Sequence, residues 1–134
     1  MSKTNAKQSN SRRVIGIVTA VLGLLAVAFG AFGAHALKEL LARLGTESTY
    51  QLANQYHFIH TLALLATLRL DDKFGQLMHV STTCWIAGVL LFSGSLYLLA
   101  ITKLSWLAFL TPVGGVFLLI GWVVLILHFY KTRA

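Results

Sequence analysis

Four long apolar stretches, each close to the length that an α-helix needs to cross a bilayer, occupy most of this 134-residue sequence. They cover residues 14–35, 49–68, 79–101 and 105–128, with short polar connections between them. Because an α-helix rises about 1.5 Å per residue, roughly 20 residues span the hydrocarbon layer. The sequence therefore predicts an all-α integral membrane protein, an antiparallel bundle of four transmembrane helices forming a single domain over residues 14–134.

The composition of the chain also indicates a membrane protein. Apolar residues make up 57% of it and charged residues only 11%, whereas a soluble domain needs more charge to cover its surface. The 11 Lys and Arg residues outnumber the 4 Asp and Glu residues, but they gather at the ends of the apolar stretches, where they set orientation. We therefore expect no nucleic acid partner. The single cysteine, Cys84, excludes an intrachain disulfide and a zinc site built from several cysteines.

The basic residues predict that both termini face the cytoplasm of a bacterial inner membrane. With this orientation the outer side holds only Lys38, Arg43 and Lys103. The inner side holds the remaining basic residues, which are Lys3, Lys7, Arg12, Arg13, Arg69, Lys73, Lys131 and Arg133. Residues 1–13 are predicted to form a mobile cytoplasmic tail. Residues 37–44 carry leucines at helical spacing and are predicted to form a short amphipathic helix at the membrane surface, ending at Gly45.

Polar side chains of the second stretch form a helical stripe. Tyr50, Asn54, His57 and Thr61 follow one another at spacings of three and four, which places them on one face. Such a face is costly against lipid, so we expect it to point into the bundle or into a partner subunit. Counting along antiparallel helices places His57, Ser93 and Thr111 roughly 9–12 Å below the outer boundary, and polar residues of all four spans share this layer in the outer leaflet. The predicted polar layer consists of His35, Asn54, His57, His60, Ser93, Ser95, Tyr97 and Thr111.

The polar layer has two interpretations. In one it forms a pocket, open toward the outer side, that binds or conducts a small solute, a proton or a cation. In the other its members hydrogen-bond to one another and fix the helix register. His35, His57 and His60 carry enough nitrogen ligands for a metal, but we predict no metal and no cofactor. Ser93-Gly94-Ser95 lacks the strand context of a nucleophile elbow, and no acid is placed to serve it, so we expect no enzyme.

Small residues mark predicted helix contacts. Gly16, Gly23 and Gly30 recur every seven residues in the first stretch, which is typical of a face that packs closely against another helix. That helix can belong to the same chain or to a second copy. In the fourth stretch Pro112, Gly114 and Gly115 are expected to interrupt the helix at the level of the polar layer.

Several short segments of the sequence resemble those of a known family. The segments 30–35, 56–62, 92–97, 111–115 and 121–122 read GAFGAH, YHFIHTL, FSGSLY, TPVGG and GW. They are similar to the domain of unknown function 423 family, the small YgdD-type inner membrane proteins of bacteria, whose eukaryotic homologues are named transmembrane protein 256. The resemblance covers nearly everything after residue 13 and implies a four-helix inner membrane protein. It implies no activity.

Two functions remain open at this point. The first is a non-enzymatic membrane protein that acts by self-association or as an accessory subunit of a membrane complex, for which the glycines of the first stretch are the reason. The second is binding or conduction through the polar layer. Membrane lipid is the one partner that either function requires.

Overall fold

The computed structural model describes residues 3–70 and 75–132, and over this part of the chain it is all-helical. The long helices are α1 (Lys3–Ala34), α3 (Glu47–Leu70), α4 (Gln76–Thr102) and α5 (Leu110–Thr132). A short helix α2 (Lys38–Leu44) and a 3-10 helix η1 (Ser105–Phe109) connect them. Lys73 and Arg133, which entered the orientation prediction, lie outside the described residues.

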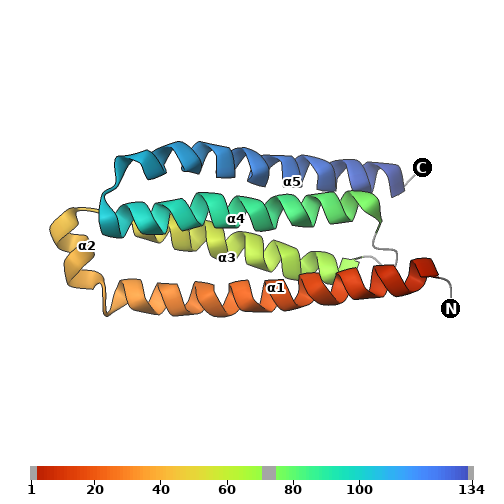
Figure 1. Cartoon of the computed structure of the whole chain (residues 1–134), viewed down its shortest axis with the longest axis horizontal. Helices are drawn as coiled ribbons and strands as arrows, with labels where there is room; N and C mark the ends of the chain where they lie inside the picture. The colour runs from red at the N-terminus through yellow and green to blue at the C-terminus, as the bar shows by residue number, and fades with distance from the viewer. Residues whose placement is uncertain (1–2, 71–74, 133–134) are drawn as a thin grey trace.

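The long helices lie side by side, and each runs opposite to the one before it (Figure 1). Helix α1 packs on α3, α3 on α4, and α4 on α5, so α1 and α5 are the outermost helices. Helix α2 lies across one end and contacts α1, α3 and α4. The core follows this order, because Leu22, Leu64, Trp85 and Leu118 come from the four successive long helices and pack together.

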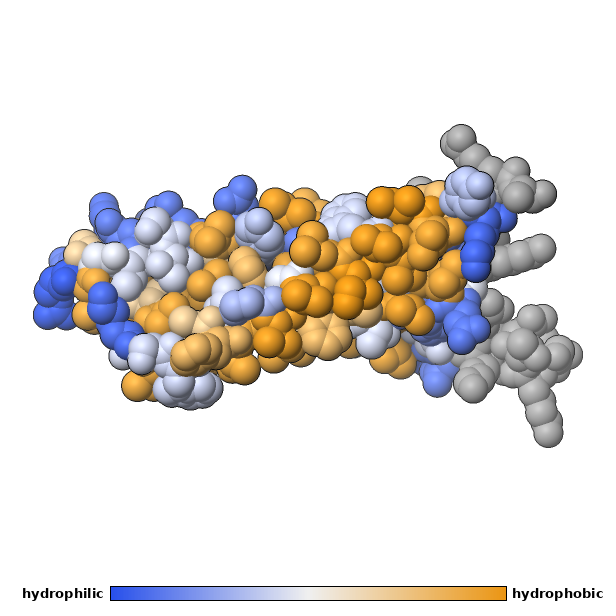
Figure 2. All heavy atoms as spheres, turned by 90° about the horizontal axis from the view of Figure 1, so that it is seen from above, coloured by the Kyte–Doolittle hydropathy of each residue, from blue (hydrophilic) through white to orange (hydrophobic). Residues whose placement is uncertain are grey.

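Three segments are long and apolar enough to cross a membrane: Ser9–Ala34, Gln76–Thr102 and Ser105–Lys131. Their outward faces expose large apolar side chains, such as Leu24 of α1 and Leu119 of α5. Figure 2, which looks onto the side that carries α5, shows a broad apolar band with hydrophilic side chains toward the two ends. Helix α3 is comparable in length but contains amides, histidines and a carboxylate, so its composition alone does not mark it as a span.

The first helix extends into the segment predicted as an N-terminal tail. Helix α1 begins at Lys3, so the residues predicted as a tail up to Arg13 are largely the first turns of this helix. The sequence from Lys3 to Arg13 contains neither proline nor glycine, so nothing in it interrupts the helix. Arg12 also donates a hydrogen bond of 2.7 Å to the carbonyl of Leu68 near the end of α3. This bond fastens the N-terminal part of α1, at Arg12, to the end of α3.

The prediction that Pro112, Gly114 and Gly115 interrupt the helix of the fourth apolar stretch is wrong, because α5 runs through all three residues. Helix α4 ends at Thr102 and is capped by Lys103, which has a φ of 60°, and the 3-10 helix η1 follows before α5 begins at Leu110. Pro112 therefore lies in the first turn of α5. Its missing N–H costs no intrahelical hydrogen bond there, because the N–H groups of the first turn have no carbonyl acceptor within the helix.

Glycines bring α4 and α5 into close contact. Gly114 faces the main chain of Leu91 and Phe92, and a Cβ placed on it would overlap that main chain. Gly121 faces the indole of Trp85, which is fully buried. Gly115 has ordinary room, with a Cβ 3.7 Å from the Phe92 ring. The approach of the two helices thus depends on Gly114 far more than on Gly115.

The glycines of α1 face α3 of the same chain. A Cβ on Gly16 would lie 3.8 Å from Leu68, one on Gly23 would lie 3.6 Å from Thr61, and one on Gly30 would lie 3.1 Å from Asn54. Gly33, which the sequence analysis did not single out, lies against the ring of Tyr50. This stripe is occupied within the chain, so it gives no reason to expect self-association through α1.

Helix α2 ends as the sequence predicted. Gly45 adopts a left-handed conformation with a φ of 65°, and its N–H bonds to the carbonyls of Ala42 and Leu41. Replacing Gly45 with alanine should lower the free energy of unfolding by about 1 kcal/mol, because alanine tolerates this conformation poorly. An SDS-unfolding titration would measure the change. Gly94→Ala is the matched control, since no atom lies within 4 Å of its added Cβ, and an equal loss in both variants would contradict the argument.

Candidate functional site

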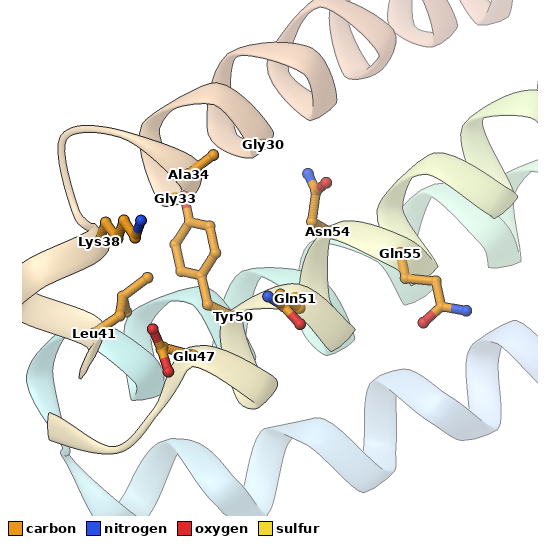
Figure 3. Close-up of a pocket in the computed structure, with 10 residues that line it drawn as sticks. All are labelled: Gly30, Gly33, Ala34, Lys38, Leu41, Glu47, Tyr50, Gln51, Asn54 and Gln55. Carbon is orange, nitrogen blue, oxygen red and sulfur yellow. The ribbon is translucent and has the colours of Figure 1, made fainter.

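A polar cavity of about 440 Å³ lies between α1, α2 and α3 (Figure 3). Its walls combine one cationic side chain, one carboxylate, three amides and a phenol with small residues of α1. Those lining residues are Gly30, Gly33, Ala34, Lys38, Leu41, Glu47, Tyr50, Gln51, Asn54 and Gln55. Lys38 and Glu47 lie toward the α2 end, whereas Gln55 lies at the far end. Oppositely charged groups with amides beside them can hold a small polar ligand.

Two side chains of α3 that line the cavity bind the main chain of α1. The Tyr50 hydroxyl donates to the carbonyl of Phe29 at 2.8 Å, and Asn54 Nδ2 donates to the carbonyl of Ala26 at 2.8 Å. Both reach these carbonyls because Gly33 and Gly30 leave the α1 surface open beside them. The glycines and the polar residues of α3 are therefore parts of one contact.

A buried hydrogen-bond network continues from the cavity wall. Asn54 Nδ2 also donates to the Tyr97 hydroxyl on α4, at 2.9 Å. Since that hydroxyl accepts from Asn54, its own proton is available to His57 Nδ1, 3.5 Å away. His57 is only 3% exposed, and its Nε2 makes no hydrogen bond of good geometry, although the carbonyl of Leu22 lies beside the ring. The network links α1, α3 and α4 at one level.

The other residues of the predicted polar layer lie in separate places. His60 accepts a hydrogen bond of 3.2 Å from Trp122 Nε1, and its Nδ1 lies 2.8 Å from the carbonyl of Tyr56. Ser95 and Thr111 share a hydrogen bond of 2.8 Å between α4 and α5.

The last two members of the layer have no such partners. Ser93 is buried without a partner for its hydroxyl, and His35 is exposed. Within residues 3–70 and 75–132 no three His, Cys, Asp or Glu side chains gather as metal ligands, so His35, His57 and His60 do not form the metal group considered above.

Of the predicted layer, only Asn54 lines the cavity. Sequence reasoning missed Lys38, Glu47, Gln51 and Gln55, although a signal was present. Glu47, Gln51 and Gln55 are spaced four apart, so they form a second polar stripe on α3, next to the stripe that contains His57.

Comparisons with known proteins agree with the sequence resemblance. The family model described as "Protein of unknown function (DUF423)" matches residues 29–115. The UPF0382 membrane protein YwdK of Bacillus subtilis (strain 168) is 39% identical over 121 residues, which is 89% of this chain and 98% of the relative.

A second relative is named as an inner membrane protein. The UPF0382 inner membrane protein YgdD of Escherichia coli (strain K12) is 37% identical over 122 residues, which is 90% of this chain and 92% of the relative. No solved structure matches. The matched region contains α2, the whole cavity lining and most of the network behind it, and the chain belongs to the DUF423 family of small membrane proteins.

Proposed function

We propose that α3 is a fourth membrane-spanning helix and that α2 lies on the outer surface. Helix α1 finishes at the end of the molecule that carries α2, whereas α4 starts at the opposite end (Figure 1). If α1 and α4 both cross the membrane, the chain between them must cross it as well. Lys38, Arg43 and Lys103 lie at the α2 end, and more basic residues lie at the other end, which supports cytoplasmic termini.

Cysteine labelling in intact cells tests this topology. With Cys84 replaced by alanine, a cysteine at Ser48 should react with a maleimide that cannot cross the membrane. A cysteine at Lys131 should react only after the cells are opened. The reverse pattern would contradict the orientation, and labelling of both sites in intact cells would contradict the four crossings.

On this topology the protein functions without catalysis, by binding a small polar ligand in the cavity between α1, α2 and α3. The observation that carries this conclusion is the lining itself, where Lys38 and Glu47 lie near three amides in the outer part of the bundle. No hydrogen bond or ion pair among the described residues engages the side chains of Lys38 and Glu47, so both are free to contact a ligand. A role in fixing the helix register would explain Asn54 and His57, but it would not explain the charges of Lys38 and Glu47.

Native mass spectrometry of the full-length protein, released from membranes in mild detergent, tests the binding. We expect the wild-type protein to retain a small molecule or a lipid that the Gln51→Leu, Gln55→Leu double variant loses. Both amides are exposed, so the double variant should still fold. Thr83→Leu, on the exposed face of α4, is the control and should retain the bound species. A wild-type protein without any bound species would contradict the proposal.

A further inference from the structure

The outward face of α3 changes character along its length. Glu47, Gln51 and Gln55 are exposed over its first turns. Farther along the same face, Leu62 and Leu65 are 59% and 53% exposed. A lipid of the outer leaflet has the same order, with a polar head near the surface and acyl chains directed to the membrane centre.

The polar part of this face lies at a level where the neighbouring helix exposes an apolar side chain. The hydrogen bonds of Tyr50 and Asn54 fix the level of α3 against Phe29 and Ala26 of α1. Gln51 and Gln55 each follow one of these α3 residues and so share their level. On α1 the exposed side chain at that level is Val27, which is 59% exposed.

The outermost helix on the other side is also apolar at this level. Asn54 bonds to Tyr97 of α4, and Ser95, two residues away from Tyr97, bonds to Thr111 of α5. Two residues after Thr111, Val113 is 48% exposed. Figure 2 shows hydrophilic side chains continuing from the α2 end along one edge of the molecule. Amides left against acyl chains here would be costly, so something polar covers this part of α3.

We infer that the cavity holds the head group of a zwitterionic aminophospholipid whose acyl chains lie along the apolar part of α3. This inference rests on the proposed binding function and adds the class of ligand. Lys38 contacts the phosphate and Glu47 contacts the ammonium group, while Gln51 and Gln55 donate to the phosphate and ester oxygens. The lipid lies deeper than its neighbours in the leaflet, which accounts for polar side chains at this level.

The charges favour this ligand over an anionic lipid. A phosphatidylglycerol head group offers a phosphate to Lys38 but leaves the Glu47 carboxylate facing only hydroxyl groups. An ammonium group next to Glu47 adds a charge-assisted hydrogen bond, which is stronger than a neutral one. The lining thus matches a ligand that carries both signs of charge.

Lipid titration of the full-length protein, followed by native mass spectrometry, tests the inference. The probes are phosphatidylethanolamine, phosphatidylglycerol with the same acyl chains, and the soluble head group glycerophosphoethanolamine. We expect the wild-type protein to bind phosphatidylethanolamine about tenfold more tightly than phosphatidylglycerol, the factor that one charge-assisted hydrogen bond supplies. Glu47→Gln should abolish this preference, and Lys38→Gln should weaken binding of both lipids.

Two variants on α2 serve as matched controls. Glu39 and Arg43 carry the same charges as Glu47 and Lys38, are exposed, and do not line the cavity. Glu39→Gln and Arg43→Gln should therefore leave both affinities unchanged. Equal binding of the two lipids by the wild-type protein would overturn the inference, as would an equal effect of Glu39→Gln and Glu47→Gln.

The remaining outcomes separate this inference from the function on which it rests. If glycerophosphoethanolamine binds as tightly as the whole lipid, the ligand is a soluble zwitterion, and the lipid is wrong while the binding function stands. If no probe and no retained molecule binds, both fail. If the protein is a dimer that the Gln51→Leu, Gln55→Leu variant dissociates, and no lipid is retained, a second copy covers α3 and the inference is wrong.

Discussion

Replacing Gly114 with alanine is expected to cost at least about 3 kcal/mol in the free energy of unfolding, the upper end of the range for overpacked sites. The added methyl group would overlap the main chain of Leu91 and Phe92. A side chain can rotate away from such an overlap, but the main chain of a helix cannot. Helices α4 and α5 would have to separate, which would expose Trp85 and Leu118 of the core. An SDS-unfolding titration of the purified protein measures the loss.

The neighbouring glycine supplies the control for this prediction. Gly115→Ala changes the same atoms on the next residue, but its Cβ would lie 3.7 Å from the Phe92 ring, an ordinary van der Waals distance. Gly115→Ala should lower the free energy of unfolding by less than about 1 kcal/mol, and the higher helix propensity of alanine favours the change. Similar losses in the two variants would show that α4 and α5 do not approach each other as described.

Asn54→Leu is expected to destabilise the protein by about 1–3 kcal/mol. The leucine removes both hydrogen bonds of Nδ2, to the carbonyl of Ala26 and to the Tyr97 hydroxyl. It leaves the hydroxyl of Tyr97, which is 8% exposed, without its donor. Combining Asn54→Leu with Tyr97→Phe should cost less than the sum of the two changes, by roughly 0.6–1.7 kcal/mol, as for other polar contacts between membrane helices.

Gln55, the residue after Asn54, shows whether the cost of Asn54→Leu comes from the burial of the Asn54 side chain. Gln55→Leu makes the same kind of change one position along α3, on an exposed side chain that makes no hydrogen bond to another described residue. Its effect on the free energy of unfolding should be within about 0.5 kcal/mol. Additive effects of Asn54→Leu and Tyr97→Phe would indicate that the two side chains do not interact.

Much of the fold could be predicted because hydrophobic length and glycine spacing have direct physical consequences. The helical class and the family follow from the sequence, as does the end of α2 at Gly45. The seven-residue repeat of Gly16, Gly23 and Gly30 predicts a packing face, but one sequence cannot say which helix fills it. Only the contacts with α3 answer that question.

The site was harder to predict because it depends on the rotation of each helix about its axis as well as on the depth of each residue in the membrane. Counting residues gives the depth of His57 along its helix, but it does not say how α3 is rotated between α1 and α4. That rotation decides that Asn54 borders a cavity, that His60 bonds to Trp122 instead, and that Gln55 faces outward. The start of α5 was missed for a similar reason, since Pro112 is equally compatible with a first turn and with a kink.

Spin labels at Gln55 and Val27 give the most direct measurement of the claim that a polar surface exists at membrane depth on α3. In lipid bilayers, with Cys84 replaced by alanine, each label is exposed in turn to oxygen, which concentrates in the acyl region, and to a water-soluble nickel chelate. The label at position 55 should be relaxed mainly by the nickel chelate, and the label at position 27 mainly by oxygen, although the two residues lie at one level. Dominant relaxation by oxygen at both positions would mean that lipid chains surround α3 and that the polar cavity does not exist in the membrane.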